Sequence, residues 1–99
     1  MSNTKNFNET LNAIKNGSLA FRVGWNNTAV VWLKPSCVIK AEWCKDPILK
    51  NFAELNGGEI EAQSVLCMCI NDDNNNKTIV SGWNPTAQDV LADDWIIVE

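Results

Sequence analysis

A six-residue segment occurs twice in this chain with one change, and it limits the folds that the chain can adopt. Residues 24–29 are GWNNTA and residues 82–87 are GWNPTA. In a duplicated structural unit the similarity continues beyond such a match. Here the flanks differ, because FRV and AVVW surround the first copy while IVS and QDVL surround the second. We therefore interpret the pair as two loops with similar local chemistry, each carrying a tryptophan, and not as an internal repeat.

The size and composition of the chain indicate a single small domain over residues 1–99. A chain of 99 residues with 45% hydrophobic residues can bury one modest core. It has no apolar run of the roughly 18 residues that a membrane span needs. Its polar start, MSNTKNFNET, lacks the apolar segment of a signal peptide, so we expect a cytoplasmic protein. Residues 1–5 are expected to be frayed and residues 71–77 to form a polar loop.

Charge and composition also restrict the chemistry. The net charge of −4 argues against binding to DNA or RNA, which requires a basic surface, but it permits one small anionic ligand held by local donors. The chain has no histidine, and so lacks the commonest general base and the commonest metal ligand. We expect no enzyme, no catalytic residue, no metal and no cofactor, although an Asp-based hydrolase remains an alternative.

Four cysteines are present, at positions 37, 44, 67 and 69. Cys67 and Cys69 lie in SVLCMCI, which is typical of a buried strand, and their alternation places them on one face. Their one-residue spacing differs from the spacing of a zinc knuckle. We expect buried free thiols, with a metal site or a disulfide as the alternatives.

Hydrophobic spacing and turn residues predict an α+β fold with a mainly antiparallel sheet and short helices, in the order α-β-β-β-α-β-β-α-β. The first helix covers 7–16 and is capped by Asn6 with Glu9. A second helix begins at Pro47 after the N-cap Asp46. A third covers 86–92. The expected strands are 19–25, 29–35, 37–43, 64–70, 78–83 and 95–99, and the first two form a hairpin.

Trp25 ends the first of these strands and has two interpretations. One is a core residue, since most tryptophans are largely buried. The other is a stacking platform for a nucleotide base, with Asn26 and Asn27 bonding the edge of the base. Both interpretations fit the residues.

A second candidate group lies at the other Gly-Trp-Asn. Trp83 precedes the third expected helix, whose first amides from Thr86 onward are a possible anion site; alternatively, Thr86 and Asp89 only cap that helix. Arg22, the chain's single arginine, lies on the strand that leads to Trp25. It is either a phosphate clamp or one half of an ion pair on the strand face.

Three stretches together resemble a known family: NFNETLNAIKNGSLAFRVGWN at the start, ILKNFAELNGGEIEA in the middle and TIVSGWNPTAQDVLADDWIIVE at the end. They resemble the second type of Thoeris anti-defence protein, which is encoded by phages and prophages. Residues 27–29 and 86–89 depart from the family pattern, which leaves open which cyclic nucleotide is bound.

The resemblance implies a protein that binds a nucleotide immune signal and does not cleave it. That signal is glycocyclic ADP-ribose of Thoeris, and for some relatives a cyclic oligonucleotide of CBASS, inside a bacterial host. It also implies a homotetramer with ligand pockets between subunits. Trp25 and Trp83 would stack on rings of the ligand, with Asn26, Thr86 and Asp89 on ribose and base edges and Arg22 on phosphate. The alternative is an acidic protein that inhibits a host enzyme by direct contact.

Overall fold

Short amphipathic segments separated by polar turns give this chain its α+β architecture. The computed structural model describes residues 3–99 and places three α-helices, two short 3-10 helices and seven strands among them. The elements are α1 (Phe7–Lys15), β1 (Leu19–Arg22), η1 (Val23–Trp25), β2 (Ala29–Lys34), β3 (Cys37–Lys40), η2 (Ala41–Trp43), α2 (Pro47–Leu55), β4 (Glu59–Ala62), β5 (Val65–Asn71), β6 (Lys77–Ser81), α3 (Ala87–Leu91) and β7 (Trp95–Val98). They follow the expected order, and β4 is an additional strand. No helix within residues 3–99 has both the length and the apolar character to cross a membrane.

The chain groups into two compact units. Unit 1 consists of the chain up to Lys34 together with the chain from Val65 onward, and unit 2 is Pro35–Ser64. Each unit has its own sheet, its own helices and its own buried residues.

Unit 1 is built on a five-stranded sheet in the order β6-β5-β2-β1-β7, in which every neighbouring pair is antiparallel. The expected hairpin of β1 and β2 is confirmed, with Ala20 opposite Val31. The last strand, β7, pairs with β1 so that Arg22 lies opposite Trp95. Lys5 also exchanges two backbone hydrogen bonds with Trp95, so the expected fraying does not extend to Lys5, while residues 1–2 lie outside the described residues.

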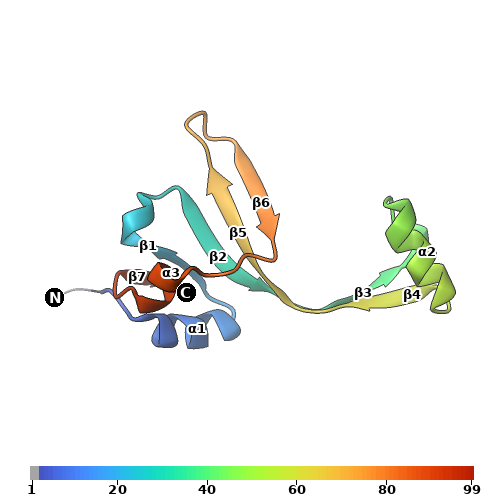
Figure 1. The fold of residues 1–99 in the computed structure, drawn as a ribbon, viewed down its shortest axis with the longest axis horizontal. Helices are drawn as coiled ribbons and strands as arrows, with labels where there is room; N and C mark the ends of the chain where they lie inside the picture. Colours follow the sequence, from blue (N-terminus) through green and yellow to red (C-terminus); the bar gives the residue numbers. More distant parts are fainter. Residues whose placement is uncertain (1–2) are drawn as a thin grey trace. The chain divides into compact units, whose positions relative to one another are not determined.

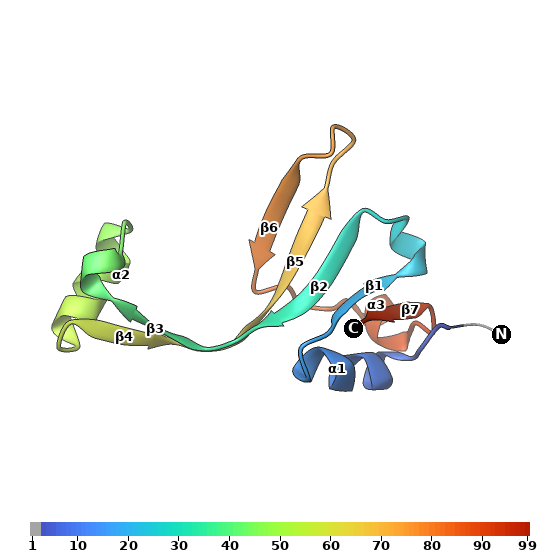
Figure 2. The same cartoon turned by 180° about the vertical axis from the view of Figure 1, so that it is seen from behind.

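The core of unit 1 lies where α1 meets the sheet. Ile14 from α1, Ala20, Val31 and Trp95 are buried almost completely and form one cluster. Helix α1 begins at the expected capping box, in which the Asn6 side chain accepts the amide hydrogen of Glu9. Figure 1 shows α1 (blue) beside α3 and β7 (red), and Figure 2 shows the same grouping from behind.

Unit 2 pairs β3 with β4 and packs α2 beside them. The expected N-cap is confirmed, because the Asp46 carboxylate accepts the amide hydrogen of Ile48 at 2.9 Å. Helix α2 nevertheless leaves most of its apolar side exposed, with Ile48, Phe52 and Leu55 at 69%, 55% and 76% of full exposure.

The cysteines only partly follow the expectation of buried thiols. All four are free, and Cys67 is buried in the sheet of unit 1. Cys44 and Cys69 are half-buried. Cys37 is exposed, because it begins a strand in a two-stranded sheet that covers few of its own side chains. The prediction of burial is therefore wrong for Cys37.

Candidate functional site

The two Gly-Trp-Asn segments adopt different backbones. The first forms the 3-10 turn η1, after which Asn26 and Asn27 both take the left-handed conformation at φ 54° and 60°. In the second, Gly82 has the positive φ of 81°, and the amides of Gly82 and Trp83 both donate to the carbonyl of Leu66. The two similar segments therefore form two different turns, as their differing flanking residues indicate.

Both turns deliver their tryptophans to the same residue, Trp95. The ring centroid of Trp25 lies 5.2 Å from that of Trp95, and the centroid of Trp83 lies 6.5 Å from it. Trp25 and Trp83 also meet each other edge to face, at 6.1 Å and an interplanar angle of 83°. We call Trp25, Trp83 and Trp95 the tryptophan cluster. Edge-to-face contacts of this kind stabilise an aromatic group beyond the area that they bury.

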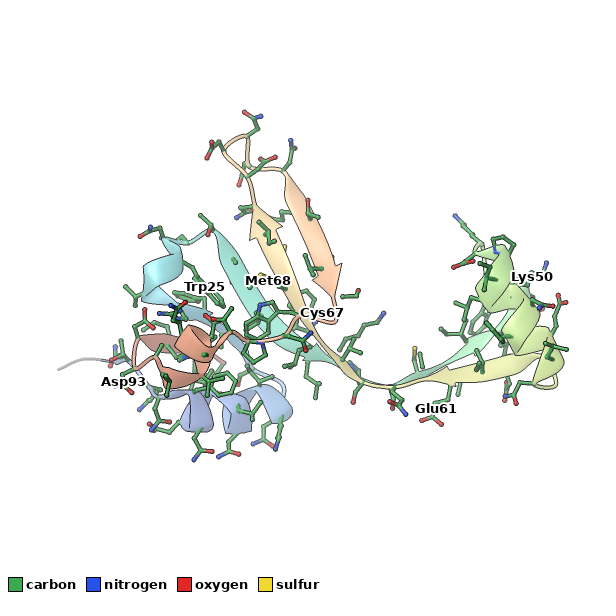
Figure 3. The ribbon with its side chains drawn as sticks, in the orientation of Figure 1. Trp25, Lys50, Glu61, Cys67, Met68 and Asp93 are labelled. Atoms are coloured by element: carbon green, nitrogen blue, oxygen red, sulfur yellow. The ribbon has the colours of Figure 1, made fainter. Side chains whose placement is uncertain are left out.

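The three members of the cluster differ in exposure. Trp95 is completely buried. Trp25 and Trp83 are only half-buried against the core, so part of each ring remains accessible. Figure 3 labels Trp25, which lies beside the C-terminal part of unit 1. Trp25 and Trp83 each pack on Trp95 while retaining an accessible surface, so the stacking platform stays a prediction for both.

Two exposed polar residues lie next to Trp25 in the sequence. Asn26 and Asn27 follow it directly and are exposed. Within residues 3–99 neither of their side-chain amides has a hydrogen-bond partner, because the turn is closed by the backbone bond from the Asn26 amide to the Val23 carbonyl at 3.1 Å. An amide side chain offers two donor hydrogens and one acceptor oxygen, a combination that suits the edge of a nucleobase.

Arg22 forms the ion pair that the sequence left as one of two alternatives. Its Nη1 lies 2.9 Å from Asp89 Oδ1, and its Nε lies 2.9 Å from Asp94 Oδ1. The second oxygen of Asp94 accepts the amide hydrogen of Gly24 at 3.0 Å. The network therefore ties the strand and turn that carry Trp25 to the residues that follow Trp83.

The charges in this network stabilise one another. Burial acts to raise the pKa of Asp89, but hydrogen bonds from the Thr86 amide and from Arg22 outweigh it, so the pKa is lowered. The pKa of Asp94 is lowered chiefly by the hydrogen bond from Arg22, with a contribution from the Gly24 amide. The pKa of Arg22 is raised by its hydrogen bonds to Asp94 and then to Asp89. All three groups are therefore charged at neutral pH.

The first glycine of the repeated segment is favoured by the close approach of Asp94 to its backbone. A Cβ atom on Gly24 would lie 3.2 Å from Asp94 Oδ2, which is tighter than ordinary van der Waals contact. The second glycine, Gly82, has open space around its Cα and is required instead by its positive φ. The shared glycine thus has a different physical cause in each copy.

Thr86 and Asp89 form the capping box of α3. The Thr86 hydroxyl accepts the Asp89 amide hydrogen at 3.1 Å, and the Asp89 carboxylate accepts the Thr86 amide hydrogen at 2.8 Å. The Asp89 carbonyl also accepts the indole hydrogen of the buried Trp95 at 2.9 Å. Capping therefore uses two of the amides at the start of α3, those of Thr86 and Asp89. Asp89 is only 6% exposed.

The structure thus brings six of the seven predicted site residues into one connected region of unit 1: Arg22, Trp25, Asn26, Trp83, Thr86 and Asp89. Asn27 adjoins this region in the same turn. Sequence reasoning did not single out Asp94. It also missed the role of Trp95 as the residue on which both turns meet. The adjacent Asp-Trp of the C-terminal stretch was the available signal for both.

Together, these elements make a small α+β protein whose most distinctive feature is an aromatic cluster followed in sequence by exposed amide side chains. Residues 5–98 match the family described as Thoeris anti-defense 2-like domain, and the chain belongs to that family. This membership confirms the resemblance and indicates a role in anti-defence against Thoeris immunity. No curated protein matches the chain.

Proposed function

We propose that this protein binds a cyclic nucleotide immune signal and sequesters it without cleaving it, so that the effector of the defence system is not activated. The ligand class is glycocyclic ADP-ribose of Thoeris, cyclic oligonucleotides of CBASS, or both. The family supports the anti-defence role. The tryptophan cluster supports the class of ligand.

The observation that carries this proposal is the meeting of Trp25 and Trp83 from two distant turns. Both rings are braced by the buried Trp95, so little conformational freedom is lost when a flat ligand stacks on them. Stacking of one base on an aromatic side chain contributes about 1–3 kcal/mol. Two half-buried tryptophans beside exposed amides match a ligand with flat bases and polar edges better than they match a uniformly apolar ligand.

Within this proposal the exposed residues make the polar contacts. Asn26 and Asn27 bond base or ribose edges, and the exposed Thr86 adds a hydroxyl on the other side of the cluster. Asp89 is buried, and its two carboxylate oxygens accept hydrogen bonds from Arg22 and from the Thr86 amide. It therefore holds the site residues in place and does not contact the ligand.

A homotetramer with pockets between subunits belongs to the same proposal. Unit 2 exposes the apolar side of α2, and the edge strand β6 of unit 1 exposes Ile79 and Val80 at 55% and 38%. Exposed apolar side chains are frequent in protein interfaces. Light scattering on the purified protein measures the assembly directly, and a monomer would contradict pockets shared between subunits.

The experiment that tests the proposal is a calorimetric titration of the purified protein with glycocyclic ADP-ribose, followed by cyclic di- and trinucleotides. We expect saturable binding of at least one of them. Heat denaturation of the complex should then release the ligand unchanged on chromatography. Absence of binding across the panel would contradict sequestration, and a cleaved ligand would indicate an enzyme.

A second candidate function is direct inhibition of a host protein, and the exposed Ile48, Phe52 and Leu55 side of α2 favours it. The net charge of −4 would suit a basic partner surface. The two functions make different predictions for the variant Phe52→Asp. This variant should abolish inhibition of a host protein by direct contact. Nucleotide binding by unit 1 should stay intact in those molecules of the variant that keep the wild-type oligomeric state.

A further inference from the structure

Arg22 is the single arginine of this chain, and two of its three guanidinium nitrogen atoms already bond to carboxylates. Its Nε and Nη1 atoms are both engaged by carboxylates at 2.9 Å, and its side chain retains only 21% of its exposure. One carboxylate, that of Asp89, comes from α3, and the other, that of Asp94, directly precedes β7. The two carboxylates together carry more negative charge than the positive charge of the guanidinium. The paired Arg22 therefore attracts a phosphate poorly.

The geometry instead links the two tryptophan turns. Arg22 directly precedes η1, the turn that ends at Trp25, and Asp94 accepts the amide of Gly24 within that turn. Asp89 belongs to the capping box of α3, which follows the Trp83 turn, and its carbonyl holds the indole of Trp95. A shift in any one of these bonds therefore moves one ring of the tryptophan cluster relative to another.

We propose that Arg22 and Asp94 are positioning residues that hold the Trp25 turn against Trp83 and Trp95 in the geometry that receives the ligand. Neither residue touches the ligand. This inference rests on the proposed function, since it assigns roles within the same nucleotide site.

The variant Asp94→Asn separates positioning from direct contact, because the two roles predict changes of opposite sign. If Arg22 clamps a phosphate, removing the competing carboxylate frees the guanidinium and strengthens binding of an anionic nucleotide. If Asp94 positions the turn, the same variant weakens binding, on the order of tenfold or more, as displaced binding groups do. Asp93→Asn is the matched control. It removes the same charge from the neighbouring position, where the exposed Asp93 (labelled in Figure 3) has no hydrogen-bond or ion-pair partner within residues 3–99.

A readout without ligand keeps the inference testable by itself. Tryptophans in edge-to-face contact couple their transitions, and the resulting signal in circular dichroism depends on the distance and angle between the rings. We expect Asp94→Asn and Arg22→Met to change this signal below the unfolding temperature, Arg22→Lys to recover part of it through one remaining ion pair, and Asp93→Asn to leave it unchanged.

The outcomes distinguish this inference from the proposed function. Weaker binding by Asp94→Asn than by Asp93→Asn, with an altered tryptophan signal, supports positioning. Equal or stronger binding by Asp94→Asn overturns positioning and leaves sequestration standing. If the wild-type protein binds none of the nucleotides, sequestration fails, and so does the ligand-related part of the inference. In that case an unchanged tryptophan signal in Asp94→Asn would also refute the link between the turns.

Discussion

At the residue scale, Trp25 and Trp83 each combine two roles that are usually separate, because each packs on the buried Trp95 and also keeps an accessible surface. Substitution by alanine therefore removes packing as well as a stacking surface. The cost in stability should stay below the roughly 3–5 kcal/mol of a fully buried Trp→Ala change.

Trp25→Ala and Trp83→Ala should each weaken nucleotide capture while the protein remains folded. Removal of a stacked ring costs about 1–3 kcal/mol per base, which corresponds to about five- to 150-fold in affinity. Calorimetric titration measures the affinity, and thermal unfolding confirms the fold. Trp43→Ala is the control, because Trp43 is 63% exposed in unit 2. Wild-type affinity in both cluster variants would contradict the proposed site.

A second prediction at the residue scale concerns Gly24→Ala, whose effect on the free energy of unfolding depends on the side chain at position 94. Gly24→Ala should destabilise the protein by about 1 kcal/mol, because the new methyl group presses on Asp94 Oδ2 and weakens a charge-assisted hydrogen bond. In an Asp94→Ala background the obstruction is absent. The φ of Gly24 lies outside the left-handed region, so the same substitution should then be neutral or stabilising through the unfolded chain.

A double-mutant cycle of chemical unfolding measures this coupling between Gly24 and Asp94. Additive effects of the two substitutions on the free energy of unfolding would show that the close approach of backbone and carboxylate does not explain why glycine occupies position 24.

At the element scale, the segment from α3 to β7 contributes two carboxylates to Arg22, and this makes part of the stability dependent on pH. The folded-state pKa values of Asp89 and Asp94 are both lowered. A lowered pKa means that the stabilisation is fully present above the unfolded-state pKa and is lost as the pH falls through the folded-state pKa.

The thermal midpoints of wild type and Asp94→Asn should therefore differ most above about pH 5 and converge as the pH falls below about 4, near the unfolded pKa of an aspartate. Thermal unfolding across this range measures the difference. A gap that stays constant with pH would show that the carboxylate charge of Asp94 does not contribute, and Asp93→Asn should show no such gap at any pH.

Elements also show how far the sequence predicts this structure. The caps at Asn6, Asp46 and Thr86 were predictable because capping depends on residues within one turn. The end of β1 was not predictable from nearby residues. The alternating pattern extends it to residue 25, but the Val23 amide bonds to the Asp94 carbonyl and the chain turns at η1 instead. The signal for that turn lies in a residue far along the chain.

The same limit applies to the candidate site. The repeated Gly-Trp-Asn marks Trp25 and Trp83, and the choice of residues around them follows from local chemistry. Their meeting on Trp95 depends on the pairing of β1 with β7, which no local pattern encodes. The interpretation of Arg22 likewise stayed open, because its two partners are supplied by that pairing.

At the scale of the whole molecule, all members of the tryptophan cluster and of the Arg22 network belong to unit 1. Unit 2 is inserted between β2 and β5, whose last paired residues are Lys34 and Val65. The core of unit 1 consists of Ile14, Ala20, Val31 and Trp95. The exposed apolar residues of α2 belong to unit 2. This division suggests that the units separate two tasks, ligand capture and contact between proteins.

Replacement of residues 35–64 by Asn-Gly should test that division. Lys34 and Val65 are direct cross-strand partners, so a two-residue turn of this type can join β2 to β5 without a change of register. The shortened chain should unfold cooperatively and keep the circular dichroism signal of the tryptophan cluster, because no residue of that cluster or of its core is removed.

The assembly of the shortened chain should be smaller than that of the full chain, since the exposed side of α2 is gone. Light scattering measures this, and Phe52→Asp in the full chain is the matched control that removes the apolar contact alone. A shortened chain that fails to fold would show that unit 1 depends on unit 2. A shortened chain that folds and assembles like the full chain would place the subunit contacts on unit 1, where the edge strand β6 exposes Ile79.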